Sequence, residues 1–466
     1  MNSRIILLTV LSTYFLIACR KEGFIESPDA NLGLSADSLF FDTVFTTAGS
    51  VTQFFRIYND NNQKLRLTSV TLAGGSSSAF KINVDGSPGP QVNNLEIDAN
   101  DSLYVFVSVL VNPNATDLPF IVQDSIRIDF NGNSRWVQLQ AWGQNANFLR
   151  GVKLNGNVVW TNDLPYVILG GLQVDTTATL TIQQGTKIYL HADAPFVVDG
   201  RLIVQGTAPD SGRVYFRGDR LDDPYNSFPG GWPGIYFRGK SHDNQLDYTV
   251  VKNAYQGIVA EQPSINANPK VVLNQCIIDN IYDAGIFGFQ TSINANNCLV
   301  SNCGKNIILA KGGTYNFSNC TVSSYTSAYL LHKEPVLLVT NYIKEGNNYL
   351  TADLSATFTN SIFWGEGGSV EDEVVVGKQG TTPFSVNFSN SLWKVKNNPA
   401  NTSATAMITN IDPLFDSIDV QKGIYNFRLK PASPAINKGL TTPFPFDLDG
   451  NPRSVGVPDM GAYEKQ

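Results

Sequence analysis

The chain has 466 residues, of which 16% are charged, and its formal net charge is −7. This length exceeds what one hydrophobic core usually supports, so two or more domains are expected. The negative charge, without any stretch rich in Lys or Arg, excludes nucleic acid and anionic lipid from the expected partners. Frequent glycine and sparse charge are typical of an all-β protein with many tight turns.

Residues 1–18 have the pattern of a signal peptide, which takes no part in the fold. Arg4 supplies the positive charge, and residues 5–17 form an apolar run too short to span a bilayer comfortably. The tetrapeptide Leu16-Ile17-Ala18-Cys19 resembles a bacterial lipobox, in which the cysteine is diacylated and becomes the mature N-terminus. The resemblance implies that Cys19 anchors the protein stably in a membrane through several acyl chains. The alternative is an ordinary secretory signal followed by a chance cysteine.

Residues 19–37 are expected to form the anchor and a linker. They include Arg20-Lys21-Glu22, which resembles the short surface-export signal of lipoproteins from the Bacteroidetes group. This resemblance implies a protein of the cell outer membrane, held by its N-terminal lipid and exposed on the cell surface. Retention on the periplasmic side of that membrane is the alternative.

Residues 38–148 predict an immunoglobulin-like β-sandwich. Short runs that alternate apolar and polar residues are separated by turn formers such as Asn59-Asp60-Asn61-Asn62 and Asp85-Gly86-Ser87-Pro88. About seven short strands with frequent turn signals are typical of such a sandwich. The expected strands are Ser38–Phe45, Val51–Tyr58, Leu65–Leu72, Phe80–Val84, Ser102–Val111, Asp124–Phe130 and Trp136–Trp142.

Residues 149–410 predict a parallel β-helix. Cys276, Cys298 and Cys320 follow one another at intervals of 22 residues, and the residues around them repeat as well. Self-similarity at so short a period, in segments rich in β-branched residues and turn formers, indicates one coil of a parallel β-helix per period. Equivalent side chains of successive coils then stack about 4.8 Å apart.

The same period operates far upstream of the cysteines. Leu180 and Leu202 lie in similar segments and are again separated by 22 residues. The predicted fold class is therefore all-β, with an N-terminal immunoglobulin-like β-sandwich followed by a parallel β-helix.

Cys276, Cys298 and Cys320, together with Cys303, are expected to be free thiols that point into the β-helix and pack as small hydrophobic side chains. Side chains in a parallel ladder point the same way rather than at one another, which disfavours disulfides. None of the three histidines has the spacing of a metal ligand to a cysteine, so no metal site is expected there.

An asparagine precedes the inward residue in most of these coils, as in Asn297-Cys298 and Asn319-Cys320. Stacked asparagine side chains can hydrogen-bond along such a column, which satisfies amides that would otherwise be buried without partners. The column is therefore interpreted as structural and not as catalytic.

The segment from Asp219 to Tyr236 interrupts the coil pattern and mixes acidic with aromatic residues. Long turns on repeat proteins often carry function, and aromatic faces beside carboxylates suit sugars. The alternative is a turn whose aromatic rings merely pack on the side of the β-helix. The candidate ligand-binding residues are Tyr225, Phe228, Trp232 and Tyr236. If the protein is an enzyme, the candidate catalytic residues are Asp219, Asp222, Asp223 and Arg220.

Residues 411–466 contain a series of motifs that ends in Asp459-Met460-Gly461-Ala462-Tyr463-Glu464. These residues resemble the C-terminal part of the choice-of-anchor Q group of bacterial surface proteins. The resemblance implies a right-handed parallel β-helix and a surface location, but it transfers no catalytic residues. The segment is expected to complete and cap the β-helix.

An oxygen-ligand site for Ca²⁺ is a second interpretation of the C-terminal segment. Asp447-x-Asp449-Gly450-Asn451 begins like a calcium loop but lacks the distal acid of an EF-hand, and Asp459 is a candidate third ligand. The alternative is an Asx turn that ends the β-helix and covers its last coil. Calcium is the only cofactor that the sequence suggests.

The leading functional hypothesis is a lipid-anchored cell-surface binding or adhesion protein that recognises glycan without catalysis. The second hypothesis is a polysaccharide lyase or glycoside hydrolase that acts on the face of the β-helix, and the third is a structural component of the cell surface. Fold analogy supports the first two equally, so the sequence does not decide between them.

Overall fold

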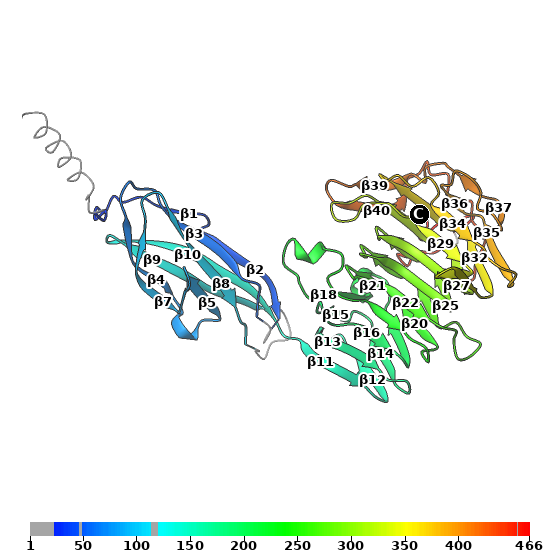
Figure 1. The fold of residues 1–466 in the computed structure, drawn as a ribbon, viewed down its shortest axis with the longest axis horizontal. Coiled ribbons are helices and arrows are strands. Elements are labelled where there is room, and N and C mark those ends of the chain that lie inside the picture. The colour runs from blue at the N-terminus through cyan, green and yellow to red at the C-terminus, as the bar shows by residue number, and fades with distance from the viewer. Residues whose placement is uncertain (1–22, 46–48, 113–119, 454) are drawn as a thin grey trace, which may run out of the picture. The chain divides into compact units, whose positions relative to one another are not determined.

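The computed structural model describes residues 23–45, 49–112, 120–453 and 455–466. Cys19 and the segments proposed for export therefore lie outside the described residues. The described chain is all-β, as expected, and its helical elements are three short 3-10 turns, η1 (Gly75–Ser77), η2 (Asp210–Gly212) and η3 (Tyr225–Ser227). It divides into two compact units, residues 1–145 and 146–466, and each is described by itself (Figure 1).

The first unit consists of two five-stranded sheets that share one hydrophobic core. Alternating residues of both sheets point into this core, as Leu103, Val105 and Val107 do. The first sheet contains, in order, β1 (Leu32–Leu34), β3 (Gln53–Asn59), β8 (Ser102–Val109), β5 (Phe80–Val84) and β6 (Ser87–Pro88). The second contains β2 (Ser38–Phe45), β10 (Asn133–Gln144), β9 (Phe120–Phe130), β4 (Leu65–Leu72) and β7 (Gln91–Ile97).

Residues 19–37 were predicted to form an anchor and a linker, but some of the described residues in this range belong to the first unit. Leu32 in β1 pairs with Asn59 of β3, and Ala30 and Leu32 are buried in the core. Phe24 already forms a bridge to Lys64. The short run of apolar residues before Ser38 therefore adds an edge strand, because the end of β3 offers unpaired backbone groups.

The second unit is a solenoid-like coil built from one parallel sheet of 26 strands. A strand pairs in parallel with its equivalent one coil later, as Leu180 does with Leu202. Ile277 pairs with Leu299, and Leu299 pairs with Thr321, so the 22-residue period is confirmed as the coil repeat. Apolar side chains from all the coils meet in one continuous core.

The coils form three faces, which we call the hydroxyl face, the strap face and the apolar face (Figure 1). The hydroxyl face contains β12 (Asn157–Trp160), β14 (Thr179–Gln183), β17 (Arg201–Gln205), β20 (Asn244–Asp247), β23 (Val271–Asn274), β32 (Leu354–Thr359), β35 (Phe384–Ser389) and β37 (Ser403–Thr405). The strap face contains β15 (Lys187–Leu190), β18 (Val214–Gly218), β21 (Thr249–Lys252), β24 (Ile277–Asp279), β26 (Leu299–Ser301), β28 (Thr321–Tyr325), β33 (Ile362–Glu366), β36 (Leu392–Trp393) and β38 (Ile408–Thr409). The apolar face contains β16 (Phe196–Val198), β19 (Ile235–Phe237), β22 (Ile258–Glu261), β29 (Leu337–Thr340) and β34 (Val374–Gly377).

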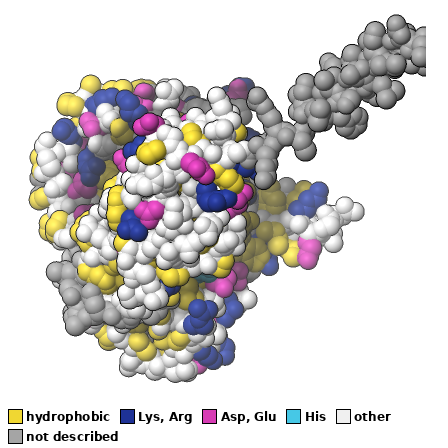
Figure 2. Space-filling model, turned by 90° about the vertical axis from the view of Figure 1, so that its left-hand side faces the viewer, with side chains coloured by type: hydrophobic (Ala, Val, Ile, Leu, Met, Phe, Trp, Pro, Cys, Tyr) yellow, Lys and Arg dark blue, Asp and Glu magenta, His cyan; other side chains and the backbone are white. Residues whose placement is uncertain are grey.

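Longer strands connect these faces, and two hairpins lie outside the large sheet. The connecting strands are β11 (Asn147–Leu154), β13 (Tyr166–Val174), β25 (Ala284–Asn296) and β27 (Lys305–Ser318). The hairpins are β30 (Tyr342–Glu345) with β31 (Asn348–Thr351), and β39 (Phe415–Asp419) with β40 (Ile424–Leu429). On the face of the molecule seen in Figure 2, basic and acidic side chains lie in small separate groups among uncharged surface.

The asparagine column makes the sharp turn from the hydroxyl face to the strap face. Asn297, Asn319, Asn360 and Asn390 all have a positive φ between 45° and 54°. Asparagine tolerates this left-handed conformation better than most residues with a side chain, so its recurrence has a backbone cause. The expected bond between amides is present where Asn360 Nδ2 donates to Asn319 Oδ1 at 2.9 Å. The predicted amide bond therefore occurs at this pair, whereas the buried Nδ2 of Asn297 has no hydrogen-bond partner among the described residues.

The four cysteines of the coils are free and buried, as predicted. The thiols of Cys276, Cys298 and Cys320 lie near backbone carbonyls of their own and neighbouring coils, for example Cys298 Sγ at 3.3 Å from the Asn296 carbonyl oxygen. Burial raises the pKa of the Cys276 and Cys298 thiols well above the ordinary value. They therefore act as small hydrophobic groups and not as nucleophiles.

Residues 411–466, which we call the strap, lie along the outside of the strap face. The strap packs on outward side chains of successive coils, including Leu299, Ile362 and Leu392, and forms a second core with them. Its path follows the asparagine column backwards: Asn390 Nδ2 donates to the Lys438 carbonyl, and Asn360 Nδ2 donates to the Leu440 carbonyl. The strap packs on Ile408 of the last coil as well, so it covers the side of many coils and not the last coil alone.

The loop around Asp447 shows how far the strap runs back. Arg213, which directly precedes β18, donates to the Leu448 carbonyl, and Gln275 Nε2 donates to the Phe446 carbonyl at 3.3 Å. These partners belong to coils far upstream of β38. The outward apolar row of the strap face explains the placement, because it would otherwise leave a long apolar stripe in water.

The end of the strap is fixed by a buried ion pair between Arg453 and Glu464, with Arg453 Nη1 3.2 Å from Glu464 Oε2. Arg453 Nε also donates to Asn297 Oδ1 at 2.7 Å, which connects the pair to the asparagine column. Burial raises the pKa of Glu464 to about 7, although the Arg453 charge opposes this. Its Oε1 is buried and has no hydrogen-bond partner among the described residues.

Thiol titration tests the inward ladder. In the native protein from residue 20 onward, we expect no reaction of Cys276, Cys298, Cys303 or Cys320 with a thiol reagent, because all four sulfurs are buried. After denaturation without reductant, all four should react. Fewer than four reactive thiols would mean that disulfides had formed and would contradict the ladder.

The pH dependence of stability tests the Glu464 carboxyl. Because its folded pKa of about 7 exceeds the unfolded value, its stabilising contribution is complete below the unfolded pKa and is lost as the pH rises through 7. We expect Glu464→Gln, which cannot titrate, to reduce the fall in unfolding free energy between pH 5 and pH 8 by roughly 1–3 kcal/mol. Urea denaturation at both pH values measures this, and the exposed Glu345→Gln should leave the fall unchanged.

Candidate functional site

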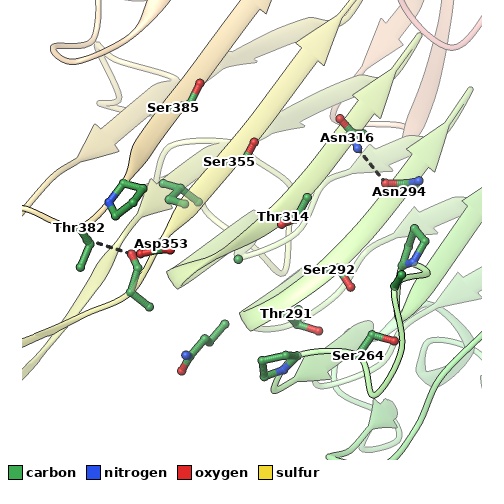
Figure 3. Close-up of a pocket in the computed structure, with 18 of the residues that line it drawn as sticks. Ser264, Thr291, Ser292, Asn294, Thr314, Asn316, Asp353, Ser355, Thr382 and Ser385 are labelled. Atoms are coloured by element: carbon green, nitrogen blue, oxygen red, sulfur yellow. Dashed lines mark hydrogen bonds between the residues drawn. The ribbon is translucent and has the colours of Figure 1, made fainter.

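A cleft of about 1080 Å³ lies on the hydroxyl face of the coiled unit. Its floor is formed by the outward side chains of β25, β27, β32 and β35 (Figure 3). One wall is the loop of residues 262–270, and the other comes from residues 351–354 and 382–384. The cleft therefore lies across four neighbouring coils.

Hydroxyl groups lie in register on the floor of the cleft. Ser292 pairs with Thr314, Thr314 pairs with Ser355, and Ser355 pairs with Ser385, so four side chains form one row across four strands (Figure 3). Neighbouring members of such a row are about 4.8 Å apart. Each hydroxyl can both donate and accept a hydrogen bond.

A second row of amides and hydroxyls lies two residues further along the same strands. It contains Asn294 and Asn316, and Asn316 Nδ2 donates to Asn294 Oδ1 at 3.2 Å. The row continues over Thr357 and Asn387. Two residues along a strand span about 6.5 Å, so the two rows make a regular grid of polar groups.

The alternation of the strands produces this grid. In β27, Tyr315 and Phe317 are buried in the core, whereas Thr314 and Asn316, which alternate with them, are exposed. The inward apolar residues hold the strand in place, and the outward polar residues take no part in the core. The grid is therefore presented on a rigid sheet and not on a loop.

The first wall is fixed by buried and half-buried partners. Asn266 Nδ2 and Asn268 Nδ2 donate to the two carboxylate oxygens of Asp243 at 2.9 and 2.7 Å. Next to this wall, the buried Lys270 Nζ donates to the carbonyls of Gly239 and Glu261 at 3.0 and 2.7 Å. Burial lowers the pKa of Lys270 to about 8. These contacts set the loop in one conformation.

The second wall is joined to the coils in a similar way. Asn341 Nδ2 donates to the Gln379 carbonyl at 2.8 Å, and the Gln379 backbone amide donates to Asn341 Oδ1, also at 2.8 Å. Thr382 Oγ1 donates to the Ala352 carbonyl at 3.2 Å. Both walls are therefore formed before any ligand arrives, which lowers the entropic cost of binding.

The chemistry of the cleft is polar but almost uncharged. Asp353 is the only charged residue among those that line it. Phe384 adds an aromatic ring, and three prolines add C–H surface. The Thr291 hydroxyl is buried at the floor and has no hydrogen-bond partner among the described residues. Such a site suits a neutral ligand with many hydroxyl groups.

The four residues named as candidate catalytic residues are bonded to partners of their own. Asp219 Oδ2 lies 2.7 Å from His191 Nδ1, and burial raises the pKa of Asp219 although the bond to His191 opposes it. Arg220 and Asp222 form a two-bond ion pair at 2.7 and 2.8 Å, and Arg220 holds the pKa of Asp222 below its usual range. Asp223 accepts a bond from Asn226. None of the four lines the cleft.

The predicted aromatic binding surface is only partly exposed. Trp232 is completely buried in the core and donates from Nε1 to the Lys252 carbonyl at 2.9 Å, so its assignment to a binding surface is wrong. Tyr236 is half-buried and donates to the Pro233 carbonyl. Tyr225 is exposed, with the Arg220 guanidinium 3.9 Å from its ring centroid, and Phe228 packs between Tyr225 and Tyr329.

The three candidate calcium ligands serve different partners in the strap. Asp447 Oδ1 accepts bonds from the Asp449 and Asn451 amides at 3.0 and 2.7 Å. Asp449 forms an ion pair with Arg428, and Asp459 accepts bonds from the Asn437 and Lys465 amides. Within the part of the chain that the structure describes, no three His, Cys, Asp or Glu side chains are grouped so that they could hold a metal ion.

The sequence reasoning missed the residues of the cleft, although a signal for them exists. Successive coils carry a polar residue at every second position, as in Ser292-Ile293-Asn294, Thr314-Tyr315-Asn316 and Ser385-Val386-Asn387. These outward positions repeat with the coil, and their uncharged polar character separates them from ordinary surface residues.

Comparisons with known proteins supply no relative of established function. No family model matches the chain, and no curated protein matches it. Within the described residues, no helix has the length and apolar character needed to cross a membrane.

Solved structures are similar only over limited parts. A family 123 glycoside hydrolase from Clostridium perfringens, studied for glycolipid glycan hydrolysis, is 13% identical over 28% of this chain and 31% of its own length, with a TM-score of 0.21. The PapD-like domain 7 of human CEP192 is 11% identical over 26% of this chain and 87% of its own, with a TM-score of 0.18. The SafA pilin–SafB chaperone complex of Salmonella enterica is 15% identical over 26% of this chain and 56% of its own, with a TM-score of 0.17. The chain spans about a third of the first of these, and likeness at this level carries no argument about function.

Proposed function

We propose that this protein binds a neutral polysaccharide at the cell surface and does not cleave it. The observation that carries the proposal is the row formed by Ser292, Thr314, Ser355 and Ser385 on the floor of the cleft. A sugar chain presents hydroxyl groups at short, regular intervals, and each of these groups also donates and accepts hydrogen bonds. A rigid grid of the same groups is complementary to such a chain.

The shape of the cleft supports an extended ligand. Its floor spans four coils, and its volume of about 1080 Å³ is at the upper end for small-molecule sites. The unpartnered Thr291 hydroxyl offers a bond that no described residue completes. Asp353 alone gives too little charge to select a cationic ligand.

The arrangement of carboxylates favours binding over hydrolysis. Glycoside hydrolysis ordinarily uses two carboxyl groups on either side of the scissile bond. Asp353 is the only acid among the lining residues of the cleft, and the acids at 219, 222 and 223 are bonded to His191, Arg220 and Asn226. The second functional hypothesis from the sequence, a lyase or hydrolase, therefore gains no support.

The cellular setting is part of the same proposal. The lipobox-like sequence at Cys19 and the following Arg20-Lys21-Glu22 support anchoring in the outer membrane with the chain exposed on the cell surface. The coiled parallel sheet is compatible with the right-handed β-helix of the choice-of-anchor Q group, and the two-sheet unit with an immunoglobulin-like sandwich. Along the chain, the two-sheet unit lies between Cys19 and the coiled unit.

A hydroxyl deletion on the floor of the cleft tests the proposal. Thr314→Val keeps the shape and the strand propensity of the residue but removes its hydroxyl. Because one hydrogen bond contributes about 1 kcal/mol, affinity for a glycan identified on an array of neutral polysaccharides should fall roughly fivefold. Titration calorimetry on the protein from residue 20 onward measures this, and each hit is also assayed for cleavage.

The matched control is Thr181→Val, an outward threonine on the same face in β14 that does not line the cleft. It should leave the affinity unchanged. An equal loss of affinity in both variants, or no binding of any neutral glycan by the unaltered protein, would contradict the proposal. Cleavage of a bound glycan would refute its non-catalytic part.

The membrane anchor is tested separately by Cys19→Ala. Without the thiol there is no acceptor for the acyl chains, so the variant should leave the membrane fraction and lack lipid by mass spectrometry. The unaltered protein should partition into detergent. Membrane retention of Cys19→Ala would contradict the lipid anchor.

A further inference from the structure

A second pocket, of about 540 Å³, lies on the strap face and shares no residue with the cleft. We call it the lateral pocket. Its walls come from the coils at 217–302, from the loops at 226–227 and 327–329, and from the turn of the β39–β40 hairpin at 420–425. In Figure 1, the loop after β18 and the β39–β40 hairpin project on the same side of the coils, as these shared walls require.

The charge of the lateral pocket is positive. Its lining contains Arg217, Lys252 and Lys422 but only one acid, Asp279. Both oxygens of Asp279 are already engaged, one by Lys252 Nζ at 3.0 Å and the other by Ser301 Oγ at 2.7 Å. The single negative charge of the pocket is therefore neutralised within the coils.

Arg217 is the cation that remains available. It projects outward from β18 in the same row as Lys252 and is partly buried. In the described part of the chain, no carboxylate lies within ion-pair distance of its guanidinium, whereas Lys422 pairs with Asp419. A guanidinium offers forked donors that match the two oxygens of a carboxylate or sulfate group.

The remaining walls are polar and rigid. Asn280 Nδ2 donates to Asn253 Oδ1 and to the Ser227 carbonyl, each at 2.8 Å, which attaches the loop to the coils. The Tyr425 hydroxyl is buried at the pocket and has no hydrogen-bond partner among the described residues. A buried hydroxyl without a partner is costly unless a ligand group or water completes its bond.

One wall also presents an aromatic surface. Tyr329 is 46% exposed, lines the pocket and packs against Phe228 at 4.7 Å between ring centroids. The fixed ring leaves a face on which the C–H surface of a sugar can stack. The pocket thus combines an unpaired guanidinium, an unpartnered hydroxyl and a ring.

We propose that the lateral pocket binds a sugar residue that carries a carboxylate or sulfate group, with the anionic group on Arg217 and a sugar hydroxyl on Tyr425. The site differs from the cleft in charge and in every lining residue, so it does not depend on what the cleft binds. The protein then recognises two chemically different saccharides, one neutral and one acidic.

The experiment measures binding of glucuronate, glucose 6-sulfate, glucose and inorganic sulfate to the protein from residue 20 onward, by ligand-observed NMR and calorimetry. We expect at least one of the two acidic sugars to bind tenfold or more tightly than both glucose and inorganic sulfate. Its affinity should fall as salt is raised, because salt screens partly exposed charges. The two acidic sugars together decide between carboxylate and sulfate.

Arg217→Gln should weaken binding of the preferred acidic sugar at least tenfold, and Tyr425→Phe should weaken it severalfold, both with an unchanged Tm. Arg135→Gln, at an exposed position of the sandwich, is the matched charge control and should have no effect. Arg217→Gln should also leave neutral glycan binding at the cleft unchanged, so this result is distinguishable from a failure of the proposed function.

Four outcomes would overturn the proposal. Binding of glucose as tightly as the acidic sugars would show that charge is not recognised. Binding of inorganic sulfate as tightly would show a simple anion site, and an undiminished affinity in Arg217→Gln, or no binding of either acidic sugar, would show that the pocket is not the site.

Discussion

The parallel register between coils is the constraint on which the rest of the second unit depends. Each strand must lie directly over its equivalent, as Ile277, Leu299 and Thr321 do, and the chain must turn within one residue between two faces. The left-handed asparagines at 297, 319 and 360 make that turn possible at the same point in three successive coils. A register shift of one residue would turn every side chain of a strand to the opposite side.

This register gives each face a chemistry of its own. Inward positions are mostly apolar, so most of the chemical variation falls on outward positions. On the hydroxyl face these are uncharged polar residues such as Thr314 and Asn316, which are left in water. On the strap face one outward row is mostly apolar, as at Leu299 and Ile362, and residues 411–466 cover these apolar side chains. The difference between an open and a covered face is therefore encoded at every second residue of the strands.

Local sequence patterns predicted most of the framework, but not what depends on distant contacts. The coil period was readable from the cysteines, and Ser38–Phe45, Leu65–Leu72 and Phe80–Val84 are strands with the expected ends. The course of the strap could not be predicted from local patterns, because it depends on hydrogen bonds between residues far apart in the chain, such as Arg453 and Asn297. Trp232 was misjudged because its loop interrupts the period that distinguishes inward from outward residues. The cleft needs walls from separate loops, which no local pattern reveals.

The strap changes how the coils can come apart. A stack of repeats is coupled only between neighbours, so its ends can fray independently of its middle. Here the strap is hydrogen-bonded to Asn390, Asn360 and Asn319 and to Arg213 of an early coil. Coils that are far apart in the stack are therefore bonded to the same segment. The unit should therefore unfold as a block. During synthesis the N-terminal coils emerge first and wait with an uncovered apolar stripe until the last residues of the chain, as far as Glu464, have been made.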